Sequence, residues 1–144
     1  MKTEEFIAQL DDAAVVTAIS AAEKRSSGEI RVYVSSKKTD GPLAQATARF
    51  RKLGMHKTRE RNGVLLYFAP QVQKFAIIGD AAIHEKCGQS FWEEVAAEIS
   101  SGLRDKQFTP AVVGAVRKVG ELLALHFPRQ GNDNDELSNE ITRD

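Results

Sequence analysis

The stretch that decides the fold covers residues 61–80, RNGVLLYFAPQVQKFAIIGD. Every residue from 64 to 69 is apolar, which is typical of a strand that is buried on both faces. Pro70 cannot donate a ladder hydrogen bond, so this strand should end there. Residues 74–79 predict a second strand after a short polar turn. A connection this short makes the two strands antiparallel, so the start of the first and the end of the second should meet at one sheet edge.

Helix and strand patterns flank this hairpin. Residues 30–35 alternate between apolar and polar side chains, which predicts a strand with one partly covered face near a sheet edge. Residues 81–87 predict a short helical turn or loop that Gly88 ends. Four segments show the apolar spacing of amphipathic helices, namely 3–26 (one helix or two), 43–53, 91–103 and 110–127.

These patterns predict an α/β fold, in which a small mixed sheet of three to four strands is sandwiched between helices. The strand–helix–strand order makes the first two strands parallel, and the third is antiparallel. A fourth strand is not visible in the pattern. We expect a single domain over residues 1–128. Residues 129–144 are polar, acidic and nearly free of apolar side chains, so we expect a mobile tail there.

Composition argues against several classes of function. The 20 basic residues equal the 20 acidic ones, so no net charge attracts nucleic acid or an anionic membrane, and we expect no nucleic-acid partner. No run approaches the roughly 18 apolar residues of a membrane span, and the acidic N-terminal segment lacks the apolar core of a signal peptide. The single cysteine, Cys87, excludes an intrachain disulfide and fits a reducing compartment. We therefore expect a cytoplasmic protein without a membrane span.

Several separated motifs resemble one known family. They are SSGEIRV at 26–32, RNGVLLY at 61–67, FAIIGD at 75–80, IHEK at 83–86 and FWE at 91–93. Together they resemble the TPM domain family, and in particular its short, stand-alone bacterial members, over about residues 12–128. The resemblance implies a compact α/β domain. It also implies a family whose members are often found near membranes and have been linked to photosystem repair, weak acid phosphatase activity and calcium binding, with no single defining activity.

The chain departs from the family pattern in two ways. Many members carry Asp directly before the Asn-Gly of the second motif, where this chain has Arg61. A carboxylate has thus become a cation, which weakens any metal site carried over from the family. Many members also have a signal peptide and a membrane anchor, and neither is visible in this sequence. Periplasmic or thylakoid roles are therefore not transferred.

The strongest candidate site is the hairpin edge, where both ends of the hairpin should meet. Arg59, Arg61 and Asn62 could bind a phosphate group there, because guanidinium forks suit phosphate oxygens. Asp80 or His84 could then act as the catalytic acid–base group.

The same edge offers a second kind of site. If the first strand runs parallel beside the hairpin, Glu29 starts at this edge and joins Asp80 and Glu85. Carboxylate oxygens suit hard cations, so the three predict a calcium site. The alternative is structural, in which Arg59 or Arg61 pairs with Asp80 or Glu85 and the edge is a solvated set of ion pairs.

Other features favour structural roles. His84 and Cys87 could share a helix face, but two ligands do not make a zinc site, and a lone cysteine is more often a small buried apolar side chain. Residues 35–38 follow a strand but contain no glycine-rich phosphate loop, so we interpret them as a polar turn. Phe91 and Trp92 fit the core better than an exposed anchor for a partner.

Three hypotheses of function follow from these features. The first is a non-enzymatic accessory or interaction domain with a protein partner, since the sequence shows no complete catalytic constellation. The second is a weak acid-phosphatase-like phosphoryl hydrolase that acts at the hairpin edge. The third is a calcium-binding regulatory module that uses the same edge.

Overall fold

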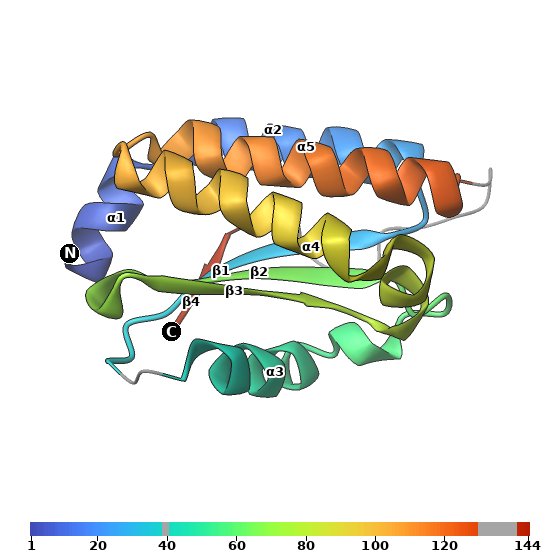
Figure 1. Cartoon of the computed structure of the whole chain (residues 1–144), viewed down its shortest axis with the longest axis horizontal. Helices are drawn as coiled ribbons and strands as arrows, with labels where there is room; N and C mark the ends of the chain where they lie inside the picture. The colour runs from blue at the N-terminus through green and yellow to red at the C-terminus, as the bar shows by residue number, and fades with distance from the viewer. Residues whose placement is uncertain (39–40, 130–140) are drawn as a thin grey trace.

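The computed structural model describes residues 1–38, 41–129 and 141–144. At its centre the predicted hairpin is confirmed (Figure 1). Strand β2 (Gly63–Ala69) pairs antiparallel with β3 (Lys74–Gly79) through the turn η2 (Pro70–Val72). Val64 lies opposite Gly79, so the two ends of the hairpin meet at one edge of the sheet.

Two further strands complete a mixed sheet. β1 (Glu29–Val34) runs parallel to β2, as predicted, and α3 (Pro42–Lys52) and the turn η1 (Met55–Lys57) form the crossover between them. A fourth strand, β4 (Thr142–Arg143), pairs in parallel with the other side of β1. The sheet order is therefore β3-β2-β1-β4.

β4 corrects the expectation for the end of the chain. The sequence predicts a mobile tail over residues 129–144, of which 130–140 lie outside the described residues. The last residues instead form a strand beside β1, with Thr142 opposite Tyr33. The Thr142 hydroxyl donates a hydrogen bond to the carbonyl of Val32 (3.3 Å). A strand that is held by polar contacts leaves no apolar pattern, which is why the sequence did not reveal it.

Helices cover both faces of the sheet (Figure 1). One face carries α2 (Asp12–Arg25), α4 (Ala81–Arg104) and α5 (Phe108–His126), with α1 (Thr3–Gln9) at one end, and the opposite face carries α3. The structure confirms the predicted α/β sandwich and divides the helical segment 3–26 into two helices. No helix in the described part of the chain is both long and apolar enough to cross a membrane.

Two apolar cores hold the layers together. The larger core joins the sheet to α2, α4 and α5, and its buried residues include Val15, Ile19, Ile30, Val32, Val64, Leu66, Val95, Val112, Val116 and Leu123. The smaller core joins the sheet to α3 through Tyr33, Ala46, Phe50, Met55, Leu65, Tyr67, Ala69 and Ala76. Burial of one such aliphatic or aromatic side chain contributes roughly 1.5–3 kcal/mol, so both faces of the sheet contribute to stability.

All of β1 is buried, although its alternating pattern predicts a partly covered face near an edge. The polar side chains of this face are buried because they have charged or aromatic neighbours. Burial lowers the pKa of Arg31, and the nearby carboxylates of Glu23 and Glu29 oppose that shift. Tyr33 stacks on Tyr67 with ring centroids 5.6 Å apart. The sheet order agrees with this burial, because β1 is an inner strand between β2 and β4.

Gly88 interrupts α4, as the sequence predicts. Its backbone angles (φ 73°, ψ 170°) are not helical. The first segment of α4 is capped by Asp80, whose carboxylate accepts a hydrogen bond from the amide of Ala81 (2.7 Å). The indole Nε1 of Trp92 donates a hydrogen bond to Nδ1 of His84 (3.1 Å), which ties the two segments of α4 together across the break.

Thr109 lies directly before Pro110, a position at which threonine often caps a helix. α5 begins at Phe108, and the Thr109 hydroxyl instead contacts the link between α1 and α2. It accepts a hydrogen bond from the amide of Asp11 (2.9 Å) and donates one to the carbonyl of Gln9 (3.4 Å). The Thr109 side chain therefore links α5 to the connection between α1 and α2 instead of capping the first turn of α5.

Candidate functional site

The hairpin edge brings Arg61 and Asp80 together. Nε of Arg61 lies 3.1 Å from Oδ2 of Asp80, and Nη2 lies 3.5 Å from Oδ1. Oδ1 also accepts from the amide of Ala81, so the carboxylate is engaged by a guanidinium and by a helix start at the same time. The Arg61 side chain remains 56% exposed, whereas the Asp80 side chain is only 8% exposed. This is the ion-paired arrangement that the sequence offered as its structural alternative.

The other phosphate-binding candidates lie in different surroundings. Asn62 is buried, and its Nδ2 donates to Oγ of Ser27 (3.1 Å), while its backbone amide donates to the hydroxyl of Thr58 (3.3 Å). These bonds fasten the start of β2 to the segment that precedes β1. Arg59 is exposed. Asn62 therefore holds the edge together from inside, and of the three phosphate-binding candidates the two arginines are exposed.

The structure does not assemble the three carboxylates of the predicted calcium site. Glu29 is buried at the start of β1, whereas Glu85 is exposed on α4. Among the described residues, no group of three or more His, Cys, Asp or Glu side chains is placed to hold a metal ion. Glu29, Asp80 and Glu85 are therefore not gathered into one cluster in the described part of the chain.

His84 and Cys87 have local roles in the first segment of α4. Nδ1 of His84 accepts the hydrogen bond from the Trp92 indole, which leaves Nε2 as the nitrogen that can carry the proton. Burial raises the pKa of the Cys87 thiol, which disfavours the reactive thiolate. Trp92 is buried, as predicted, and Phe91 packs edge-on against it.

A second polar site lies at the opposite end of β1, where the sequence indicated only a polar turn. The side chain of Asp144 is bound there by four donors. The Tyr33 hydroxyl (2.5 Å), the Ser36 amide (2.5 Å), the Ser36 hydroxyl (2.8 Å) and the Ser35 hydroxyl (3.0 Å) all donate to its carboxylate. We call the group of Tyr33, Ser35, Ser36 and Arg49 around this carboxylate the carboxylate niche.

Arg49 and a tyrosine stack complete the carboxylate niche. Nη2 of Arg49 lies 3.8 Å from Oδ1 of Asp144, and its guanidinium carbon lies 4.7 Å from the centre of the Tyr33 ring. Burial alone would raise the pKa of Asp144, but hydrogen bonds from Tyr33, Ser36 and Ser35 outweigh it and lower this pKa to about 2. Burial and the bond to Asp144 raise the pKa of Tyr33. The niche therefore favours a negative charge.

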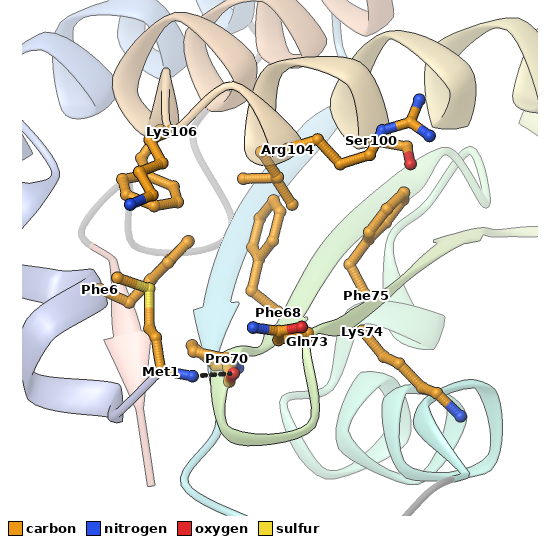
Figure 2. Close-up of a pocket in the computed structure, with 12 residues that line it drawn as sticks. Met1, Phe6, Phe68, Pro70, Gln73, Lys74, Phe75, Ser100, Arg104 and Lys106 are labelled. Atoms are coloured by element: carbon orange, nitrogen blue, oxygen red, sulfur yellow. Dashed lines mark hydrogen bonds between the residues drawn. The ribbon is translucent and has the colours of Figure 1, made fainter.

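The same end of the molecule carries a hollow of about 400 Å³ between α1, the hairpin turn and the end of α4. Figure 2 shows the rings of Phe68 and Phe75 rising from the sheet toward α4. We call this hollow the phenylalanine groove. Its floor and walls are apolar, and its rim is cationic, through residues that include Phe6, Phe68, Phe75, Phe108, Lys74, Arg104 and Lys106.

The solved structures that resemble this chain include two bacterial proteins. The NMR structure of the BA42 protein from the psychrophilic bacterium Bizionia argentinensis is 34% identical, with a TM-score of 0.85 over 92% of each chain. The NMR structure of the N-terminal domain of the cg2496 protein from Corynebacterium glutamicum is 16% identical, with a TM-score of 0.54 over 83% of this chain and 72% of that chain. This second likeness shows the fold alone.

Comparison at the sequence level points to one family. No protein with a curated description matches the chain. The family model of the TPM domain, in contrast, matches residues 1–122, which is most of the sequence. The motifs that suggested this family lie on β1, β2, β3 and α4, around the hairpin edge. The chain therefore belongs to the TPM domain family.

Proposed function

We propose that this TPM domain is a non-enzymatic interaction domain, and that its phenylalanine groove binds an acidic segment of a partner protein. The observation that carries the proposal is the groove, which combines an aromatic floor with a cationic rim. The lone Cys87 supports a cytoplasmic location for this interaction.

The floor of the groove suits an apolar anchor. Phe6 lies between Phe68 and Phe108, with ring centroids 5.7 Å and 5.4 Å away. Phe75 extends this row beyond Phe68 at 6.2 Å and is only partly buried. A Leu or Phe side chain that becomes buried against such a surface gains roughly 1.5–3 kcal/mol. One or two anchors of this kind would supply much of the affinity of a modest complex.

The rim of the groove selects for negative charge. Arg104 and Lys106 both line it and are exposed. Neither forms a hydrogen-bonded ion pair with a side chain in the described part of the chain, and no acidic residue is among the described residues that line the groove. Complementary charge mainly raises the association rate and excludes wrong partners. An apolar anchor flanked by Asp or Glu therefore fits both parts of the groove.

Phosphoryl hydrolysis at the hairpin edge is the second candidate, and the phosphatase label of the family model favours it. In such an enzyme Arg59 and Arg61 would hold the phosphate, and Asp80 or His84 would transfer the proton. Arg61 would first have to leave Asp80, which it contacts at 3.1 Å. If hydrolysis of a phosphate ester is unchanged in Arg61→Ala and Asp80→Ala, the activity does not come from this edge.

A calcium-binding module is the third candidate. It lacks an assembled set of ligands among the described residues. A thermal midpoint that does not respond to millimolar calcium would remove it, because a ligand that binds the native state must stabilise that state.

The interaction proposal can be tested by peptide display against the immobilised full chain. We expect the selected peptides to share one or two Phe, Leu or Trp residues next to Asp or Glu. The double variant Arg104→Glu/Lys106→Glu should weaken their binding about tenfold or more, because like charges across an interface repel.

A matched control uses the same charge reversal on the other side of the molecule. Arg51→Glu/Lys52→Glu changes two exposed cations of α3 and should leave peptide binding unchanged. A selection that enriches no acidic peptide contradicts the proposal. Equal loss of binding in both double variants also contradicts it, because the effect would then be one of net charge rather than of the groove.

A further inference from the structure

We propose that the outer edge of β1, together with the carboxylate niche, is a docking site for an extended peptide that places one acidic residue in the niche, and that β4 and Asp144 occupy this site in cis. This inference concerns a different surface from the phenylalanine groove. It does not depend on the function proposed for that groove.

The first support is the construction of the niche. Its donors are two side-chain hydroxyls, a phenol and a backbone amide, and all of them converge on one carboxylate. With Asp144 bound, Ser35 and Tyr33 are 0% and 2% exposed. The Ser35 amide also donates to the carbonyl of Phe68 (2.8 Å) and the Tyr33 ring stacks on Tyr67, so contacts other than those with Asp144 hold both donors in place. Buried donors need an acceptor. Their convergence therefore specifies an acidic residue at this point of a bound strand.

The second support is the mode of binding. β4 adds to β1 in parallel, with Thr142 opposite Tyr33 and Arg143 opposite Val34. A strand that joins an exposed sheet edge, with side-chain pockets that give specificity, is an established way of recognising peptides. The niche binds the side chain of Asp144, which directly follows the two paired residues, so it recognises the residue at that position of a bound strand.

The third support is that the cis strand is short and is anchored mainly at one residue. β4 contains two residues. The ion pair between Arg143 and Glu4 has a separation of 3.7 Å, but both side chains are largely exposed, so it contributes little. Asp144 supplies the well-directed contacts. A peptide from another chain needs to replace these contacts, the Thr142 hydrogen bond and the short backbone pairing, and it competes against the high effective concentration of a tethered segment.

The test uses the full chain with the single change Asp144→Ala and follows backbone amides by NMR. The probe is a synthetic heptapeptide that ends in Ile-Thr-Arg-Asp, and its matched control ends in Ile-Thr-Arg-Asn. We expect the Asp peptide to shift the amides of residues 33–36 and to bind at least about tenfold more tightly than the Asn peptide. The unchanged chain should need about tenfold more Asp peptide for the same shift, because its own Asp144 competes.

Two outcomes would overturn the proposal: equal binding of the Asp and Asn peptides, or an absence of shifts at Ser36 in the Asp144→Ala chain. Tyr33→Phe in the same background removes one donor and should reduce the preference for Asp. If Asp144→Ala does not fold, Asp144→Asn keeps the shape of the side chain and replaces it in the same titration. Amides of α5, which covers the opposite face of the sheet from α3 and Arg49, report whether each variant is folded.

Discussion

The environment of Asp144 favours the charged form of its side chain. Four hydrogen bonds and the nearby guanidinium of Arg49 act on a carboxylate whose side chain is 23% exposed. Burial would raise its pKa, but the hydrogen bonds from Tyr33, Ser36 and Ser35 outweigh this effect and lower the pKa from 3.8 to about 2. A carboxyl group with a lowered pKa in the folded chain stabilises the fold above its unfolded pKa and loses that contribution as the pH falls through the folded value.

We therefore expect the docking of Asp144 to persist at pH 5 and to be lost between about pH 4 and pH 2. The amide of Ser36, which donates to this carboxylate, should report the transition with a midpoint near pH 2. Tyr33→Phe should move the midpoint upward and destabilise the fold by about 1–2 kcal/mol, since it removes a hydrogen bond to a charged group. An unchanged midpoint in Tyr33→Phe would show that its hydroxyl does not hold the carboxylate.

Sequence reasoning placed Arg61 next to Asp80 but could not place Asp144. The first pair follows from the hairpin, since two strands joined by a short turn fix the positions of their ends. Tyr33 and Asp144 are 111 residues apart, and the contact between them is polar. The periodicity of apolar residues in a sequence does not indicate a polar contact between residues so far apart. The signal that was present is weak: two serines directly after a parallel strand, where ligands often bind in open α/β sheets.

At the scale of elements, local patterns predicted most helices and strands because each has its own apolar stripe or run. The exceptions are β4 and the covered face of β1, both of which depend on polar contacts with distant segments. The break in α4 could be predicted because a single residue, Gly88, causes it. Gly88 has φ 73° and ψ 170°, a region that is essentially restricted to glycine.

Gly88→Ala should therefore destabilise the fold by roughly 1–3 kcal/mol through backbone strain alone. A new Cβ at this position meets no atom within 4 Å, so steric contact is not the cause. Gly114→Ala is the matched control, because Gly114 is exposed within α5 and its new Cβ is also free of contacts. It should stabilise the fold by about 0.5–1 kcal/mol. Denaturant unfolding of both variants checks the opposite signs.

At the scale of the whole molecule, the packing of two neighbouring helices on one face of the sheet depends on a small residue. α2 and α5 lie side by side over the sheet (Figure 1). A Cβ added to Gly120 on α5 would lie 2.6 Å from Cβ of Ala22 on α2. Neither atom can rotate away, because each is attached directly to the backbone. Contact between these two helices therefore depends on the absence of a side chain at Gly120.

Gly120→Ala should destabilise the fold by roughly 1–3 kcal/mol, in spite of the better helix propensity of alanine, because the two helices must separate. Ala22→Gly in the same chain should recover part of the loss. The two single variants and the double variant form a cycle whose coupling energy, measured by chemical denaturation, should be at least about 0.5 kcal/mol. A coupling energy of zero would mean that α2 and α5 accommodate the new methyl group without contact.

The arrangement of the aromatic residues also gives the protein two separate optical probes. Its one tryptophan, Trp92, is buried beside Gly79 near the hairpin edge, and its two tyrosines are stacked on each other in the smaller core. Tryptophan fluorescence therefore reports on α4 and the end of β3. Ultraviolet absorbance of the tyrosines reports on the face that holds Asp144. Loosening of either face can thus be followed by light alone, without a label, and distinguished from loosening of the other.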